Sequence, residues 1–393
     1  MISFDKKDNC CGCYACVNVC PKNCIVMKED DEGFYYPNVN NSRCVDCKLC
    51  EKVCPIINKE KFLQENGLEV NNTFVAYTKN ETIRRNSSSG GIFSELAVNV
   101  LNNDGAVFGV AFDSNFNAHH IMVNNVYDLN KLRGSKYIQS QVENTYQEAE
   151  ELLKSGKLVL FTGVACQIAG LKTYLRKSYE NLITVDVLCH GVPSGKVWRK
   201  YIEYKQKKHN SKIKEFYFRN KDKGWKLFTV KQKYANNQCE SSIFTQDPFI
   251  QLFLGEICLR PSCYNCRFKD IKRPSDITIG DSWGIENYMP EMDDDKGTSV
   301  VIAHTEKGIN LINCIKDNLI IKNAELDEAL PPTADSRKSV LPHKNRERLF
   351  HRLDKNTNIE KLADLVRDRF PKPSIKSRIK IKIKKVCNIK QVI

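Results

Sequence analysis

Long apolar runs are missing from this sequence of 393 residues, although 41% of its residues are hydrophobic. No stretch of about 18 apolar residues occurs, so we expect no transmembrane helix. The first residues, Met1 to Lys7, carry charge with no apolar stretch behind them, which is not the pattern of a secretory signal. We therefore expect a cytoplasmic protein in a reducing compartment, where disulfide frameworks are rare.

Acidic residues are missing from positions 371–393, which hold eight Lys and Arg side chains. The formal net charge of the whole chain is +14, so this tail accounts for more than half of it. The positive charge is therefore concentrated in a basic tail, and the rest of the chain is only mildly basic. We expect no nucleic-acid partner. Ile375, Ile379 and Ile383 recur between the lysines at helical spacing. Two interpretations stay open: a solvated tail, or a basic amphipathic helix in peripheral contact with an anionic membrane.

Cysteine is abundant: the chain has 18, and ten of them precede residue 55. Eight of these form two copies of the run C-x2-C-x2-C-x3-C-P, which is the spacing of bacterial two-cluster ferredoxins. Three thiolates on one tight turn bind a 4Fe–4S cluster, and the fourth cysteine of each run binds the other cluster. The predicted ligand sets are Cys10, Cys13, Cys16 and Cys54 for one cluster, and Cys44, Cys47, Cys50 and Cys20 for the other.

A structural zinc module is the alternative for these cysteines, because paired C-x2-C motifs also bind zinc. Two complete four-cysteine runs, each followed by a proline (Pro21 and Pro55), favour the iron–sulfur interpretation. Cys11 and Cys24 fall outside the spacing, and we expect them to be small apolar fillers.

An α/β body is expected after a polar linker at residues 61–72. Two units of strand, glycine turn and helix predict a mostly parallel sheet with crossover helices, and closely spaced later strands predict a mixed α+β part. The expected strands are residues 106–112, 157–161, 181–188, 215–219, 228–234, 276–279 and 299–304, and the expected helices are residues 92–101, 165–177 and 194–208. The expected domains are a small ferredoxin domain at 1–60, two parts of a cofactor-binding body at 73–150 and 151–345, and a helical, basic tail at 346–393.

Two loops of the body have the composition of an anion site. The turn Ser88-Ser89-Gly90-Gly91 precedes a helix, where backbone N–H groups suit a phosphate or pyrophosphate, although an ordinary serine cap explains it as well. The loop around Ser135 and Lys136 is basic and contains a glycine. It could contact an anionic cofactor through Lys136, or it could be a solvated turn.

Two strand ends carry further candidates. Thr162, Gly163 and Cys166 follow a presumed parallel strand, at the edge where ligands bind in open α/β sheets. Cys166 begins a helix, which predicts a lowered thiol pKa, although it could be a buried cysteine that only packs. Asp281 and Trp283 follow another strand, where they suit a cofactor pocket or a packed turn.

A third cysteine group consists of Cys258, Cys263 and Cys266. Three cysteines need a fourth ligand, and the best candidate is Cys189 at the end of a strand. Such a set could hold a third 4Fe–4S cluster or a zinc ion, and a purely structural trio is the remaining alternative. His190, like Cys166, is a candidate proton donor near the substrate, although a structural hydrogen bond is the more common role of such a histidine.

Taken in order, these segments resemble the beta subunits of coenzyme F420 (deazaflavin) hydrogenases and dehydrogenases. The matching pieces, together with the two ferredoxin runs, are residues 88–91, 134–137, 163–171, 185–194, 258–266 and 280–284. The resemblance implies an FAD or FMN in the body, a 4Fe–4S cluster held by the body's cysteines, and flavin contacts from Ser88, Ser89, Gly90, Gly91, Ser135, Lys136 and Thr162. It also leads us to expect Gly-Thr-Pro-Cys-Gln where the chain reads Gly163-Val164-Ala165-Cys166-Gln167. That departure removes a proline and a hydroxyl donor from the turn.

The predicted function is an iron–sulfur flavoprotein oxidoreductase. It would move electrons between an organic hydride donor or acceptor and a redox partner protein or small electron carrier, through flavin and 4Fe–4S clusters. The alternative is a ferredoxin-like electron-transfer protein without its own substrate, such as one associated with polysaccharide biosynthesis. A nucleic-acid-binding iron–sulfur protein is a third class, and only the basic tail supports it.

Overall fold

The computed structural model describes residues 1–60, 72–353 and 357–371. Nearly all of the expected linker at 61–72 and the basic stretch from residue 372 onward, with its predicted membrane contact, lie outside the described residues. Within these ranges, no helix combines the length and the apolar character needed to cross a membrane.

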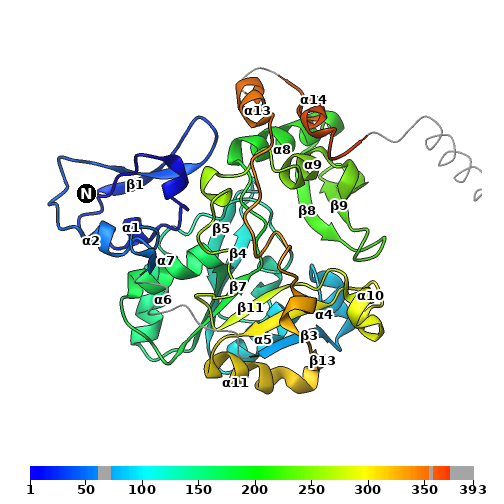
Figure 1. Ribbon diagram of the computed structural model, residues 1–393, viewed down its shortest axis with the longest axis horizontal. Helices are drawn as coiled ribbons and strands as arrows, with labels where there is room; N and C mark the ends of the chain where they lie inside the picture. The colour runs from blue at the N-terminus through cyan, green and yellow to red at the C-terminus, as the bar shows by residue number, and fades with distance from the viewer. Residues whose placement is uncertain (61–71, 354–356, 372–393) are drawn as a thin grey trace, which may run out of the picture.

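An eight-stranded mixed sheet forms the centre of the body (Figure 1), with the strand order β13-β3-β12-β11-β7-β6-β4-β5. The four central strands β11, β7, β6 and β4 are parallel, and the other strands pair antiparallel on both sides. The strands are β3 (Asn72–Thr78), β4 (Ala106–Phe112), β5 (Ala118–Val123), β6 (Val159–Val164), β7 (Leu182–Val187), β11 (Ile277–Asp281), β12 (Ser299–Ala303) and β13 (Leu319–Asn323). The predicted mixed α/β body, with a parallel part and a later antiparallel part, is confirmed.

Helices cover both faces of this sheet. On one face α5 (Ile92–Asn102) and α11 (Glu306–Ile315) share a core with Val107 of β4. On the other face α6 (Thr145–Lys154) and α7 (Ala165–Leu175) share a core with the next residue, Phe108. Successive strand residues point to opposite faces, so burial on both sides requires apolar residues at nearly every strand position. This is why the central strands are continuous apolar runs in the sequence.

A second, aromatic-rich core lies beside the sheet, around Trp198, Phe216 and Phe249. It is formed by β8 and β9 of the three-stranded antiparallel sheet β10-β9-β8 and by four helices. These elements are β8 (Ile213–Asn220), β9 (Thr229–Tyr234), β10 (Cys239–Ile243), α8 (Gly195–His209), α9 (Pro248–Leu254), α13 (Arg346–Leu353) and α14 (Ile359–Ala363).

The cysteine-rich segment is small and packs beside α7, as the blue part of Figure 1 shows. Its regular elements are α1 (Ala15–Asn18), α2 (Leu49–Lys52), β1 (Ile25–Glu29) and β2 (Tyr35–Val39). Gly170 of α7 makes the close approach possible, because a Cβ added there would lie 2.8 Å from the Cβ of Cys13. The buried Arg260 links the two parts: its Nε donates to the carbonyl of Cys10 (2.9 Å) and its Nη2 to that of Tyr35 (3.0 Å).

The remaining regular elements are short helices and single 3-10 turns. They are α4 (Glu81–Asn86), α10 (Ile285–Tyr288), α12 (Leu326–Ala329), η1 (Lys7–Asn9), η2 (Asp128–Lys131), η3 (Phe244–Gln246), η4 (Pro261–Cys263), η5 (Pro290–Met292), η6 (Lys316–Asn318) and η7 (Asp364–Val366).

Candidate iron–sulfur and cofactor sites

The two ferredoxin runs have the same backbone conformation. In each run the residue before the second cysteine and the residue after it have positive φ: Gly12 (69°) and Tyr14 (66°) in the first, Asp46 (46°) and Lys48 (62°) in the second. A single helical turn follows both times. Left-handed residues within a turn direct successive backbone N–H groups into one concavity, which suits negatively charged sulfur.

Cys10, Cys13, Cys16 and Cys54 lie together, so the structure assembles the first predicted set from both runs. Cys13 interacts electrostatically with Cys16 and Cys54, and Cys16 interacts with Cys10 and Cys54. Each of the four residues is at most 8% exposed. Burial raises the pKa of the Cys54 thiol to about 12, so a thiolate here needs a positively charged partner such as iron.

The second predicted set lines a surface hollow of about 360 Å³, to which Cys20, Cys44, Cys47 and Cys50 all contribute. Cys47 is exposed and Cys50 is buried, so this hollow, which we call the outer hollow, opens to solvent on one side. Cys24 also lines it, with its Sγ 3.4 Å from that of Cys20.

A larger hollow of about 600 Å³ lies where the cysteine-rich segment meets the carboxyl edge of the sheet. Five cysteines line this inner hollow: Cys11, Cys166, Cys189, Cys263 and Cys266. Cys166 interacts electrostatically with Cys189 and Cys266, and Cys263 interacts with the same two residues. The structure therefore groups Cys166, Cys189, Cys263 and Cys266 as four thiols around one space.

Cys258 is not part of this group. It is 0% exposed and packs in the aromatic-rich core with Val197 and Phe249. Its carbonyl accepts from the amide of Ser194 (2.8 Å). The predicted set of Cys189, Cys258, Cys263 and Cys266 is therefore not brought together, because the chain between residues 258 and 263 runs from that core to the hollow.

The expectation of a lowered pKa at Cys166 is wrong. A hydrogen bond with Cys11 and then burial raise the pKa of the Cys166 thiol well above its ordinary value, which outweighs its place at the start of α7. Burial likewise raises the pKa of Cys189 to about 11 and that of Cys263 to about 12. Soft thiols of this kind become thiolates on binding a soft metal centre.

Three cations line the inner hollow, Arg267, Lys269 and Arg273, together with one acid, Asp8. Lys269 and Arg273 favour the thiolate of Cys189, and Lys269 also favours that of Cys266. Lys269 Nζ donates to the carbonyl of His190 (2.8 Å), and Arg273 Nη1 lies 3.2 Å from Oδ2 of Asp186. The hollow is therefore positively charged on the side of Cys189, which suits a negatively charged thiolate cluster.

His190, the second predicted catalytic residue, is not among the residues that line the inner hollow. Its Nδ1 lies 3.3 Å from Oδ2 of Asp335, and its ring meets that of Phe253 edge-on, with the centroids 5.1 Å apart. Its Nε2 is buried and has no hydrogen-bond partner among the described residues. The structure thus places the imidazole beside Asp335, while the backbone carbonyl of His190 faces Lys269.

The two predicted anion loops contact each other. Oγ of Ser88 accepts hydrogen bonds from the amide of Ser135 (2.7 Å) and from its hydroxyl (2.8 Å). Position 90 has room only for glycine, because a Cβ there would lie 2.5 Å from the carbonyl oxygen of Ala76. Gly91 has φ 89° and caps α5, whose first N–H groups have no partner within the helix. The sequence-predicted turn and basic loop therefore form one surface at the start of α5.

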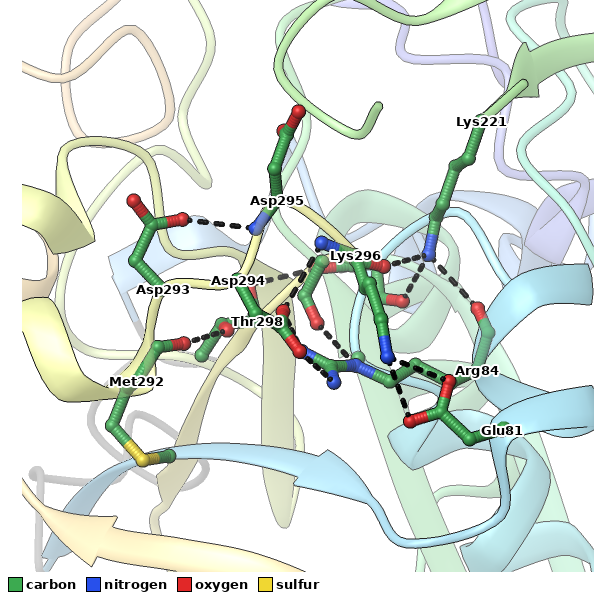
Figure 2. Close-up of polar contacts among 12 residues, drawn as sticks. Glu81, Arg84, Lys221, Met292, Asp293, Asp294, Asp295, Lys296 and Thr298 are labelled. Atoms are coloured by element: carbon green, nitrogen blue, oxygen red, sulfur yellow. Dashed lines mark hydrogen bonds and ion pairs between the residues drawn. The ribbon is translucent and has the colours of Figure 1, made fainter. Parts of the chain in front are cut away.

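A half-buried lysine, Lys221, holds the serine–glycine turn in place (Figure 2). Lys221 Nζ donates to the carbonyl oxygens of Arg84 (2.9 Å), Ser89 (2.7 Å) and Lys296 (2.7 Å). Arg84 in turn makes a two-point contact with Asp294, at 2.8 and 2.7 Å. Burial lowers the pKa of Lys221 to about 7. The turn is thus linked, through Lys221 and Arg84, to the segment of residues 292–298 that Figure 2 draws.

Asp281 and Trp283 belong to a charged aromatic group next to Lys221. Asp281 accepts from Arg219 Nη1 (2.8 Å) and from Nε1 of Trp225 (2.8 Å). The Trp225 and Trp283 rings are stacked, 4.5 Å apart and within 2° of parallel. Trp225 is buried and Trp283 is 46% exposed, so the outer ring is open to a ligand.

The other predicted cofactor residues are held by the protein itself. Lys136 Nζ donates to the carbonyl of Arg133 (2.9 Å), and burial lowers the pKa of Lys136 to about 7. The Thr162 hydroxyl donates to the carbonyl of Phe108 (2.9 Å). Gly163 is buried in β6, and a Cβ added there would lie 3.1 Å from Oε1 of Gln167.

Comparison with known families finds three matching family models along the chain. Residues 9–56 match the 4Fe–4S dicluster domain. Residues 73–146 match the N-terminal part, and residues 156–329 the C-terminal part, of the coenzyme F420 hydrogenase/dehydrogenase beta subunit. The chain belongs to this family of beta subunits. It is therefore an iron–sulfur protein of an oxidoreductase family, with a 4Fe–4S domain in front of the family's body.

Individual relatives are distant. The chain is 23% identical to one of the subunits of the F(420)H(2) dehydrogenase of Methanosarcina mazei over 271 residues, which is 64% of this chain and 76% of that one. It is 37% identical over 49 residues to an uncharacterised ferredoxin of Methanocaldococcus jannaschii, of which it spans 62%. A chain of the F420-reducing [NiFe] hydrogenase complex from Methanosarcina barkeri aligns with 77% of this chain and 91% of its own, at 17% identity and a TM-score of 0.47.

Sequence reasoning missed several residues of these sites. Cys166 was a candidate for catalysis but not for metal binding, and Cys11 was expected to be a filler. Arg219, Lys221 and Lys269 carry no motif, since a single basic residue has no spacing to mark it. Two of these residues had a signal in the sequence: Cys166 follows a presumed parallel strand, and Cys11 lies directly beside a predicted ligand.

Proposed function

We propose that the chain is an iron–sulfur flavoprotein that moves electrons between an organic hydride carrier and a redox partner protein. The observation that carries the proposal is the series of three thiol groups from the outer hollow, through the buried Cys10 group, to the inner hollow. When bound, the flavin would exchange a hydride, which carries two electrons, and the clusters would carry these electrons one at a time. The side chains of this protein would hold the clusters and the flavin.

The inner hollow fits a third 4Fe–4S cluster, held by Cys166, Cys189, Cys263 and Cys266. This set replaces the predicted one, with Cys166 in place of Cys258. Four soft donors around one half-buried space suit iron–sulfur or zinc, and Lys269 and Arg273 offset the negative charge of the thiolates.

The surface at the start of α5 fits a flavin. Ser88 and Ser135 hold the two loops together, and the helix N-terminus presents backbone N–H groups to a phosphate. Arg219 Nε is buried and has no hydrogen-bond partner among the described residues, although Arg219 pairs with Asp281 through its other nitrogens. The exposed face of Trp283 would stack with a planar ring. The names of the relatives make coenzyme F420 the first hydride carrier to test.

The redox partner would meet the protein at the outer hollow. The thiol of Cys47 is exposed there, and Val45 on the rim is 59% exposed. A rim that joins exposed Val45 with the charged residues Asp46 and Lys48 faces solvent beside the proposed cluster, which permits the short approach that electron exchange needs. A basic, membrane-facing tail stays a prediction, because residues 372–393 lie outside the described part.

Anaerobic purification with iron, sulfide, zinc and flavin measured per chain tests the proposal. We expect about twelve irons, from three four-iron clusters, and one flavin. About eight irons would remove the third cluster. Full iron without flavin would leave an electron-transfer protein with no substrate of its own, and zinc without sulfide would contradict the redox function altogether.

A further inference from the structure

Arg260 is a buried cation that no carboxylate balances. It is 0% exposed and lies directly before η4, at the boundary between the cysteine-rich segment and the body. Its hydrogen bonds all go to uncharged oxygens. Nε donates to the carbonyl of Cys10 (2.9 Å), Nη2 to that of Tyr35 (3.0 Å) and Nη1 to Oε1 of Gln139 (3.1 Å). In the part of the chain that the structure describes, no Asp or Glu side chain forms a salt bridge with Arg260.

A charge inside a protein costs free energy unless an opposite charge or a metal centre lies near it. Aromatic rings stabilise part of this charge, since the guanidinium carbon lies 4.3 Å from the ring centroid of Tyr36. Arg346 shows the more usual solution at the same boundary, because its guanidinium makes a two-point contact with Glu32, at 2.8 and 2.6 Å. Arg260 has no such partner, so an anionic group bound beside it would supply the balancing charge.

Two proposed cluster sites flank this side chain. Cys10, whose carbonyl accepts from Arg260, belongs to the buried group that would hold the first ferredoxin cluster. A Cβ at Gly12 would lie 3.2 Å from Cζ of Arg260, so the guanidinium lies against the turn that carries Cys10 and Cys13. On the other side Cys263, which lines the inner hollow, donates its amide to the Arg260 carbonyl (2.9 Å). The guanidinium favours the thiolates of Cys10 and Cys263 alike.

We propose that the unpaired charge of Arg260 raises the reduction potentials of both the first ferredoxin cluster and the cluster of the inner hollow. This inference rests on the proposed function, because it requires a cluster on each side. Reduction adds one electron, and therefore one negative charge, to a cluster, and a cation nearby stabilises that state. The effect is strong where water is excluded, as it is around this side chain.

Arg260 takes no part in the electron transfer itself. An electron that leaves one cluster oxidises it and reduces the other, and no proton moves with it. Arginine is not deprotonated in proteins, so its charge is present at every pH at which the chain folds. Because one side chain acts on both sites, both potentials should move together when its charge is changed.

Gln139 offers a way to neutralise Arg260 in place. Gln139→Glu keeps the shape and the acceptor of the 3.1 Å contact but turns it into an ion pair. The full chain is purified anaerobically, iron per chain is measured, and the midpoint potential of each cluster is followed by EPR during a redox titration. We expect Gln139→Glu to keep about twelve irons and to lower the potentials of the first and inner clusters more than that of the outer cluster. Gln139→Met, which removes the acceptor without adding a charge, is the matched control and should leave all three potentials unchanged.

Variants of the arginine itself separate its charge from its contacts. Arg260→Gln should lower the same two potentials, and Arg260→Lys, which retains a positive charge, should recover most of that shift. Arg346→Gln is the control for contact between the two parts of the molecule, because Arg346 also binds the cysteine-rich segment but is paired with Glu32. It should move the potentials far less than Arg260→Gln, since Arg346 and Glu32 are both partly exposed to solvent.

The outcomes distinguish this inference from the function on which it rests. About eight irons in the unmodified protein would overturn the inner cluster and the inference with it. Full iron with unmoved potentials in Gln139→Glu would overturn the role of Arg260 and leave the proposed function standing. Equal shifts in Gln139→Glu and Gln139→Met would assign the effect to geometry and not to charge, which would also overturn the role of Arg260. A shift confined to one cluster would contradict a single cation that serves both.

Discussion

The outer and inner hollows are each lined by five cysteine thiols, of which we propose four as ligands, but they are built in opposite ways. The outer hollow takes Cys44, Cys47 and Cys50 from one short turn, and it opens to solvent at Cys47. The inner hollow takes its cysteines from a helix start, a strand end and a loop, and Lys269 and Arg273 line it. A local turn can make a cluster site at a surface, whereas a site inside the body requires the tertiary fold.

Replacing Cys166 should have the largest effect on this comparison. We expect Cys166→Ala to lower iron from about twelve to about eight per chain, because the inner hollow would lose a ligand. Cys258→Ala is the matched control, since Cys258 lies in the aromatic-rich core and not in the hollow. It should keep the iron and lose about 1–2 kcal/mol of stability from the small cavity it leaves. Iron loss in Cys258→Ala with full iron in Cys166→Ala would contradict our ligand set.

Crowding the boundary should separate the cysteine-rich segment from the body. The Cβ of Gly170→Val would meet the side chain of Cys13, at 2.8 Å before any relaxation. We expect about 1–3 kcal/mol of destabilisation, with loss of iron from the buried and inner groups but not from the outer hollow. Denaturant titration and iron analysis measure both effects. Thr173→Val, on the same helix, controls for a branched side chain, and an equal loss there would sink this explanation.

Loosening the serine–glycine turn should affect the flavin without affecting either hollow. Lys221→Met removes the donor to three carbonyl oxygens while keeping most of the side-chain volume. We expect flavin retained on purification to fall about tenfold, with iron unchanged. Lys223→Met, two residues away and exposed, is the control. Unchanged flavin in Lys221→Met would show that the turn does not need this clamp.

Acid should destabilise the body through a single histidine, independently of either hollow. Burial lowers the pKa of His120 to about 4, below its unfolded value of about 6.5. The unfolded state therefore binds more protons as the pH falls, and stability that is full above about pH 6.5 is lost toward pH 4. Between pH 7 and pH 5 we expect a loss of about 2 kcal/mol from this group.

Chemical denaturation of the iron-free chain at several pH values measures this loss. His120→Gln should flatten the pH dependence over this window, whereas His119→Gln should preserve it because His120 is intact. A dependence that is equally steep in His120→Gln would assign the acid sensitivity to other groups.

Much of the fold follows from apolar patterning. The expected strand at residues 106–112 coincides with β4, and the expected helix at 92–101 is one residue shorter than α5. Strands β3, β5, β10 and β13 of the body were not among the expected strands. Of these, β10 and β13 lie at sheet edges, where few positions are buried and the apolar run is broken. The turn at Ser88 and the loop at Ser135 were both found, but not their contact, which depends on how the loops are placed around the sheet.

The sequence by itself identified the two ferredoxin runs. Their cysteines lie a few residues apart on single turns, and the same spacing occurs twice between residues 10 and 55. The sequence also determined that a two-sided apolar sheet follows. Only the tertiary structure decided which cysteines of the body lie together. Cys166, Cys189, Cys263 and Cys266 line the inner hollow, whereas Cys258 packs in the aromatic-rich core. The physical reason is that contacts between distant segments arise from the packing of helices and strands. The spacing of residues along the chain does not reveal this packing.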